Sequence, residues 1–215
     1  RLHFITRKRK VTTILEFGVG VSTTIFGNAL SLNKKEYFNF SSQNLRRANL
    51  YECHSVDNYQ TWIDKCKNKI PSYLIENGFN SLYKSNLITS EFCGRVCTYY
   101  DPLPNICPDL IYLDGPDQFS SQGNIRGIST AHQDRMPMAA DILSFEHFLQ
   151  PGTLIIIDGR TANARFLKCN LQRNWYHFHS QKWDQHFLEL QEEPLGIYNK
   201  RMIEHCLGKE YFNRI

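Results

Sequence analysis

Residues 11–24, VTTILEFGVGVSTT, decide the fold. The first seven are β-branched or apolar except for Glu16, which is typical of a buried strand. Gly18 and Gly20 follow, and glycine allows a turn to adopt positive φ or to approach a ligand closely. Ser22 then opens a stretch with helical spacing that runs to Leu30. The segment therefore predicts a strand, a tight turn and a helix whose first N–H groups are free to bind a ligand.

The same rhythm of strand and helix continues along the chain. Further strands are predicted at 51–56, 95–100, 108–113 and 153–157, with helices at 59–69, 138–149 and 162–171. Residues 175–180 and 186–191 alternate with a period of two, as in an antiparallel pair. Strands that alternate with helices predict a mostly parallel sheet covered on both faces, which binds ligands at the carboxyl ends of its strands.

Length and composition place the chain among globular proteins. At 215 residues it fits one domain, 1–215, and 41% hydrophobic with 13% aromatic residues excludes a disordered chain. No apolar run is long enough for a membrane span. The net charge is +4, and we interpret the basic run at 7–10 as a solvated lead-in to a strand, so nucleic acid is not an expected partner.

Cysteine usage and the first residue bear on location. The seven cysteines form no CxxC pair and no even set, which favours a reducing, cytoplasmic setting over a disulfide or zinc framework. The chain begins with Arg1 instead of Met, so we expect it to start inside a longer gene product.

The residues around the first turn discriminate between cofactors. A dinucleotide fold requires a third glycine where this chain has Thr23, because that glycine permits close packing of helix on strand. Glu16, two residues before Gly18, would repel a pyrophosphate but suits the ammonium group of an amino-acid-like ligand. An NAD or nucleotide-sugar enzyme is therefore the weaker alternative.

The pattern E-x-G-x-G-x-S-T at 16–23 resembles the first motif of class I S-adenosylmethionine (SAM)-dependent methyltransferases. The order of elements over nearly the whole chain is also similar. The resemblance implies an α/β, Rossmann-like seven-stranded class I methyltransferase fold, with a mostly parallel sheet and a terminal antiparallel hairpin, and SAM as cofactor. The cofactor-binding residues that it implies are Glu16, Gly18, Gly20, Ser22, Thr23, Asp57, Asp101 and Asp114.

Within that set, the glycine-rich turn would line the methionine part of SAM, and Asp57, which closes the second predicted strand, would bind the ribose hydroxyls. A carboxylate that accepts from two hydroxyls is a sound match. Asp101 would lie near the adenine. The alternative for Asp101 is a plain turn residue before Pro102.

Asp114 and Asp158 follow the next two predicted strands. They resemble the metal-binding aspartates of catechol-type and macrolide-sugar O-methyltransferases, and two such carboxylates could hold Mg²⁺. The catechol-type pattern has Asn after the second aspartate, whereas this chain has Gly159. Solvated loop carboxylates are the alternative.

Residues 116–137 form a polar, lid-like insertion that is too long for an ordinary connection. If no metal is present, His132 in this stretch is a candidate general base, with a surface histidine as the alternative. The candidate catalytic residues are thus Asp114, His132 and Asp158. Arg126, Arg135 and Arg160 are candidates to bind an anionic substrate, unless they only form ion pairs within the loop.

His177 and His179 share one face of a predicted strand, an arrangement that can hold a metal together with His186. Ordinary hairpin histidines are the simpler interpretation.

Taken together, these features predict a SAM-dependent O-methyltransferase that acts on a small polar, sugar-like or anionic acceptor. A non-catalytic binding module with the same fold is a further alternative. The expected partner is a small-molecule acceptor, such as a sugar or nucleotide-sugar, with no membrane partner and with a homodimer as an additional option.

Overall fold

The large sheet has seven strands in the computed structural model, which describes all residues 1–215. Their spatial order is β3 (Asn80–Lys84), β2 (Glu52–Asp57), β1 (Thr13–Phe17), β6 (Leu110–Leu113), β7 (Leu154–Asp158), β9 (Gln185–Leu190) and β8 (Trp175–Ser180). Six of these strands run in the same direction, and β9 runs opposite to them. The predicted α/β, Rossmann-like fold with a seven-stranded sheet, mostly parallel and with a terminal antiparallel hairpin, is confirmed.

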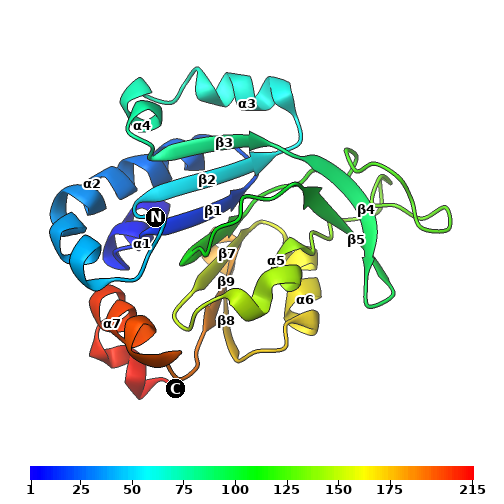
Figure 1. The fold of residues 1–215 in the computed structure, drawn as a ribbon. Coiled ribbons are helices and arrows are strands. Elements are labelled where there is room, and N and C mark those ends of the chain that lie inside the picture. Colours follow the sequence, from blue (N-terminus) through cyan, green and yellow to red (C-terminus); the bar gives the residue numbers. More distant parts are fainter.

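Helices cover both faces of this sheet, as Figure 1 shows. The α-helices are α1 (Leu2–Lys8), α2 (Val21–Asn44), α3 (Gln60–Lys67), α4 (Ser72–Glu76), α5 (Asp141–Phe145), α6 (Thr161–Asn170) and α7 (Gly196–Cys206). Short 3-10 turns lie at Glu146–Phe148, Gln181–Trp183 and Lys209–Asn213. None of the helices combines the length and apolar character that a bilayer crossing requires.

The core has two halves because successive residues of a strand point to opposite faces. Ile14 packs with residues of α2, α3 and α4 on one face. Leu15 and Phe17 pack on the other face with residues of α5 and α6. All five residues of β1 are buried, as expected for a central parallel strand.

The third strand of the sheet was predicted at 95–100, and that assignment is wrong. The strand beside β2 is β3, whereas Arg95–Asp101 is β5, which pairs with β4 (Asn86–Phe92) in a separate antiparallel hairpin. The sequence of β3, NSLYK, is polar because β3 is an edge strand, and only its first residue is buried. A search for apolar runs therefore passes over it.

Three assignments that involve helices also need correction. The basic run at 7–10 precedes β1 as expected, but its first two residues end α1, a helix that was not predicted. The helix that begins at the glycine-rich turn extends to Asn44, well past the predicted end at 30. The helix predicted at 138–149 starts at Asp141 and ends in a 3-10 turn.

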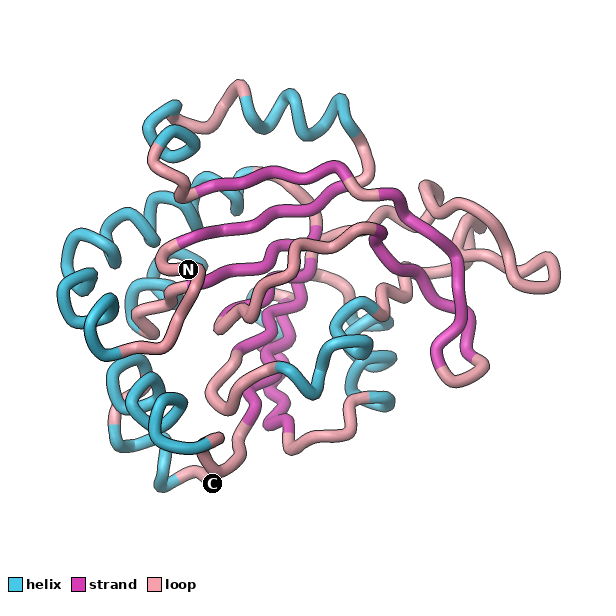
Figure 2. Tube along the Cα trace, viewed as in Figure 1, coloured by secondary structure: helices cyan, strands magenta, loops and turns pink.

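The 116–137 loop contains no helix or strand, and Figure 2 shows it as loop beside the β4–β5 hairpin. It is attached to that hairpin by backbone hydrogen bonds, since the Gln122 carbonyl accepts from Thr89 N–H at 2.8 Å and Gln122 N–H donates to the Leu87 carbonyl at 2.8 Å. Gln122 thus forms an isolated parallel bridge beside Ile88 of β4.

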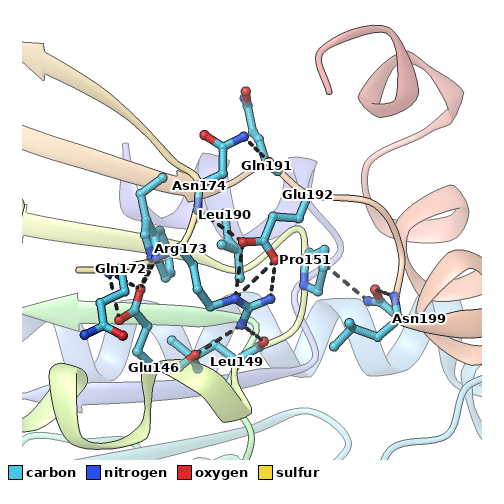
Figure 3. A network of polar contacts seen from close by, with 12 residues as sticks. Glu146, Leu149, Pro151, Gln172, Arg173, Asn174, Leu190, Gln191, Glu192 and Asn199 are labelled. Atoms are coloured by element: carbon cyan, nitrogen blue, oxygen red, sulfur yellow. Dashed lines mark hydrogen bonds and ion pairs between the residues drawn. The ribbon is translucent and has the colours of Figure 1, made fainter.

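A polar network built on Arg173 ties the terminal hairpin to the α5 region (Figure 3). The Arg173 guanidinium donates to Glu192 at 2.5 Å and to the Leu149 carbonyl at 2.5 Å. Glu146, which is 3% exposed, accepts from Arg173 N–H at 2.9 Å and from the Trp175 indole at 2.8 Å. These charge-assisted bonds hold the start of β8 against the turn that precedes β7.

Candidate functional site

A cleft of about 680 Å³ opens at the carboxyl ends of β1, β2 and β6. This is the edge where sheets of this type bind ligands. The cleft is lined by Leu2, Gly18, Val19, Gly20, Val21, Ser22, Ile25, Asp57, Asn58, Tyr59, Trp62, Tyr100, Tyr112, Asp114, Gly115, Pro116, Asp117 and Arg160.

Two glycines set the shape of the cleft floor. Gly18 has φ +94°, and a Cβ there would lie 2.9 Å from the backbone nitrogen of Gly115. A Cβ on Gly115 would in turn lie 2.9 Å from Gly18 Cα. The turns after β1 and β6 therefore contact each other through backbone atoms alone, and a side chain at either glycine would prevent this contact.

Glu16 lies beneath the glycine-rich turn and is fully buried. Its Oε2 accepts from the Thr23 hydroxyl at 2.7 Å and from the Ser55 hydroxyl at 2.5 Å, while its Oε1 has no hydrogen-bond partner. Burial raises the pKa of this carboxyl to about 7, against neighbouring hydroxyls that lower it. Thr23 also accepts from Gly20 N–H at 3.0 Å, so Glu16 and Thr23 together hold the turn.

Asp57, at the end of β2, braces the turn from the other side. Its Oδ2 accepts from Val19 N–H at 3.1 Å and its Oδ1 accepts from Tyr59 N–H at 2.9 Å. The Trp62 indole donates to the Val19 carbonyl at 2.6 Å. A carboxylate oxygen accepts more than one hydrogen bond, so Asp57 retains capacity for a ligand hydroxyl in the cleft.

Tyr100 reaches the cleft from β5 and stacks on Phe17 with ring centroids 5.9 Å apart. Its side chain is 4% exposed, and its hydroxyl has no hydrogen-bond partner. Burial raises the pKa of this phenol well above its usual value, and the negative charge of Asp57 adds to the rise. A buried, unpaired hydroxyl at the wall of a cleft is available to a ligand.

The two aspartates predicted to share a metal have other partners. Asp158 accepts from the Tyr112 hydroxyl and, at 2.8 Å, from the Gln185 amide, so both of its oxygens are engaged. Asp114 lies 3.8 Å from Arg160 Nε. No three His, Cys, Asp or Glu side chains gather closely enough to hold a metal ion. The residues present do not fit a magnesium site, and the metal prediction is not supported.

Arg160 fastens the turn that carries Asp114. Its guanidinium donates to the Asp114 carbonyl at 2.5 Å and to the Pro116 carbonyl at 2.6 Å. The side chain is only 18% exposed, so most of it faces the protein. Arg160 therefore holds the edge of the cleft in place. This structural role differs from the predicted one, which was to bind an anionic substrate.

The structure divides the predicted residues into three groups. Gly18, Gly20, Ser22, Asp57, Asp114 and Arg160 line the cleft. Glu16, Thr23 and Asp158 are close to it as supports. Asp101, Arg126, His132 and Arg135 are exposed and outside it.

Asp101 is misplaced because the third strand was misassigned; it ends β5, where it pairs with Asn86. His132 and Arg135 interact within the 116–137 loop instead: the His132 ring lies 3.9 Å from Asp134, and Arg135 donates to the Ser129 carbonyl at 2.6 Å.

The sequence interpretation missed the aromatic and apolar residues of the cleft, namely Leu2, Tyr59, Trp62, Tyr100 and Tyr112. Tyr59 and Trp62 directly follow the predicted Asp57, and both are about half exposed. Exposed aromatics right after a ligand-binding strand end are a usable signal, because such side chains stack on planar ligands. No pattern in the sequence pointed to Leu2, because the helix that carries it, α1, was not predicted.

This chain is similar to solved structures but to no family model or curated sequence. No family model matches the sequence, and no curated protein is similar to it at a significant level. The structure of an O-methyltransferase from Bacillus cereus in complex with SAH is similar over 87% of this chain and 77% of that chain, with a TM-score of 0.45 and 13% sequence identity. A match at this level does not identify a function.

Proposed function

We propose that this chain binds SAM in the cleft and transfers its methyl group to a small acceptor. The observation that carries the proposal is the unpaired polar atoms around one glycine turn: Oε1 of Glu16 beneath it and the Tyr100 hydroxyl opposite. Buried polar atoms without a protein partner are uncommon, and at a cleft they indicate a polar ligand.

The residues fit the parts of SAM. The acidic Glu16 and the free N–H groups that start α2 suit an ammonium and a carboxylate, and Asp57 suits ribose hydroxyls. Tyr59 and Trp62 offer aromatic faces for the purine. A pyrophosphate fits less well, because Glu16, Asp57 and Asp114 surround the turn with carboxylates and Thr23 fills the place of a third glycine.

When bound, SAM supplies an electrophilic methyl group on a sulfonium sulfur. The protein then has to hold an acceptor in line with that methyl and remove its proton. Asp114 is the proposed proton acceptor, since it borders the cleft and its side chain is 53% exposed. Partial burial raises the pKa of its carboxyl, Arg160 lowers it and Asp158 raises it further. A raised carboxyl pKa favours proton uptake from a hydroxyl.

The proposed acceptor is therefore a hydroxyl of a small polar compound, such as a sugar, and the reaction needs no metal held by Asp158. The 116–137 loop joins the cleft only through Pro116 and Asp117. We propose that it shapes the acceptor entrance without supplying the base.

A matched pair of variants tests the cofactor site. Asp57→Asn should weaken SAH binding by about tenfold, the value of one lost charge-assisted hydrogen bond. Asp101→Asn should bind SAH like the wild type, because Asp101 is outside the cleft. Isothermal titration calorimetry measures both. Equal weakening in the two variants, or none in either, contradicts the proposed site.

The proton acceptor is tested by methyl transfer from labelled SAM to a panel of hydroxylated compounds. Asp114→Asn should abolish most of the transfer while leaving SAH binding within about twofold, because the loss affects only the chemical step. Retained transfer in this variant would assign the proton to another group.

A further inference from the structure

A second pocket, of about 360 Å³, lies between α6 and the β8–β9 hairpin. We name it the histidine pocket. Six of its lining residues carry the inference: Thr161, Arg165, Lys168, His177, His179 and His186. In register, His186 lies beside Ile157, one residue before the end of β7, so this pocket is at the same end of the sheet as the cleft.

One wall of the pocket is a helical stripe. Thr161, Ala164, Arg165 and Lys168 are spaced i, i+3, i+4 and i+7 along α6, which places them on one face of the helix. Neither Arg165 nor Lys168 forms an ion pair or a side-chain hydrogen bond within the protein. Outside this pocket, eight pairs of basic and acidic side chains do form ion pairs.

The opposite wall is a set of imidazoles. His177 and His179 lie on one face of β8, and His186 pairs in register with His179. His186 is 3% exposed, and its ring is bonded on both sides, to His177 Nε2 at 3.0 Å and to the Thr161 hydroxyl at 3.0 Å. Nε2 of His179 is buried without a hydrogen-bond partner.

We propose that the histidine pocket binds a tetrahedral oxyanion, either free phosphate or the phosphoryl group of a small metabolite. Arg165 and Lys168 supply two uncompensated positive charges, and His179 Nε2 supplies a free polar atom. The Asp184 carboxylate lies 3.6 Å from His179 Nε2, and it offsets one charge only. Converging cationic donors of this kind recognise phosphate.

The geometry does not suit a metal ion. The rings of His179 and His186 are stacked with centroids 3.8 Å apart and planes within 6°. Parallel rings direct their nitrogens alongside one another, whereas a tetrahedral metal needs them to converge. Both nitrogens of His186 are also already bonded.

Anion affinity should rise as the pH falls. Burial lowers the pKa of His186 to about 4 and also lowers the pKa of His177. The nearby charge of His179 on β8 lowers both values further, as does Arg165 of α6 for His186 and Lys168 of α6 for His177. Asp184 opposes the shift at His186. A bound oxyanion favours the protonated imidazoles, so protonation and anion binding promote each other.

The test is a titration of the folded protein with sodium sulfate at pH 7, 6 and 5, followed by imidazole NMR signals and calorimetry. Sulfate keeps its charge over this range, so any pH dependence comes from the protein. We expect shifts of the His177, His179 and His186 signals and an affinity that rises at least about threefold from pH 7 to pH 5, because the lowered pKa values of His177 and His186 place their protonation in the acidic range. Parallel titrations with inorganic phosphate and with glucose 6-phosphate identify the source, the tighter ligand being the better model of the natural one.

The double variant Arg165→Gln/Lys168→Gln should weaken sulfate binding by about tenfold or more. Its control is Lys35→Gln/Lys67→Gln, which removes the same charge from exposed lysines outside the pocket and should bind like the wild type. Absence of histidine shifts, equal binding by both double variants, or a response to Zn²⁺ with none to sulfate would overturn the proposal. SAH binding in the cleft is independent of this result.

Discussion

At the residue scale, the contact between Gly18 and Gly115 shows why this turn needs glycine. Gly18 combines a positive φ with a neighbour 2.9 Å from the place of a Cβ, so a side chain there meets both strain and backbone. Gly78 also has a positive φ, of +75°, but has open space around it. These two glycines allow strain and steric contact to be measured separately.

We predict that Gly18→Ala lowers the free energy of unfolding by about 3 kcal/mol, from backbone strain plus displacement of the Gly115 turn. It should also weaken SAH binding by at least about tenfold. Gly78→Ala should cost about 1 kcal/mol and leave binding unchanged. Urea unfolding and calorimetry measure these effects. Equal costs in both variants would show that the contact with Gly115 is unimportant.

Glu16 gives stability a pH dependence with a defined sign. Its folded pKa, about 7, lies above its unfolded value of 4.5, because burial disfavours the charged form. The folded state therefore holds the proton more tightly, and this contribution is complete below about pH 4.5 and is lost as the pH rises through about 7. Asp141, whose buried carboxyl also has a pKa raised to about 7, adds a loss in the same range.

We predict that Glu16→Gln reduces the fall in stability between pH 4.5 and pH 7 by up to about 3 kcal/mol, since Gln stays neutral. The slope that remains belongs to Asp141, and a double variant with Asp141→Asn should flatten the profile further. Denaturant titrations across this pH range provide the measurement. A Glu16→Gln profile as steep as that of the wild type would contradict the assignment.

At the element scale, the Arg173 network decides how firmly the terminal hairpin is attached. The Arg173 side chain is 10% exposed, and its removal leaves Glu192 without its ion-pair partner and the Leu149 carbonyl without a hydrogen bond. We predict that Arg173→Met lowers the free energy of unfolding by about 3 kcal/mol. In the control variant Glu36→Gln, loss of the more exposed Arg7–Glu36 pair should cost less than about 1 kcal/mol. Thermal unfolding compares them, and a smaller effect at Arg173 than at Glu36 is the contrary result.

The ends of β6 and β7 bear on metal binding. Asp158 is engaged by Tyr112 and Gln185, and the Asp114 turn is held by Arg160. We predict that millimolar Mg²⁺ leaves the melting temperature and SAH affinity unchanged, in the wild type and in Asp158→Asn alike, because a ligand stabilises only the protein that binds it. A rise in melting temperature that Asp158→Asn removes would restore the magnesium site.

The elements that the sequence predicts well are those with a strong local pattern. β1, β6 and β7 are buried along most of their length, and burial makes their sequences recognisably apolar. β3 was missed because an edge strand needs little apolar surface, and this moved Asp101 to the wrong place. α1 was missed because its basic end resembles a solvated segment.

At the scale of the whole molecule, the cleft combines residues from β2, β5, β6, α1, α2 and α3 with the turn that follows β1. The sequence motifs identified the cleft residues at the strand ends, because parallel strands bring their carboxyl ends together at one edge of the sheet. Tyr100 and Leu2 arrive through tertiary packing of a separate hairpin and a preceding helix, which no local pattern encodes. The hydrogen-bond partners of Asp158 and Arg160, the Gln185 amide and the Pro116 carbonyl, are likewise distant in sequence.

Calorimetric titration of the wild-type protein with SAM, SAH and NAD⁺ tests the central claim most directly. The carboxylates around the glycine-rich turn favour an ammonium-bearing nucleoside and disfavour a pyrophosphate. We predict micromolar binding of SAM and SAH with one site per chain, and no measurable binding of NAD⁺. Binding of NAD⁺ without SAM or SAH, or binding of none of the three, would contradict the claim.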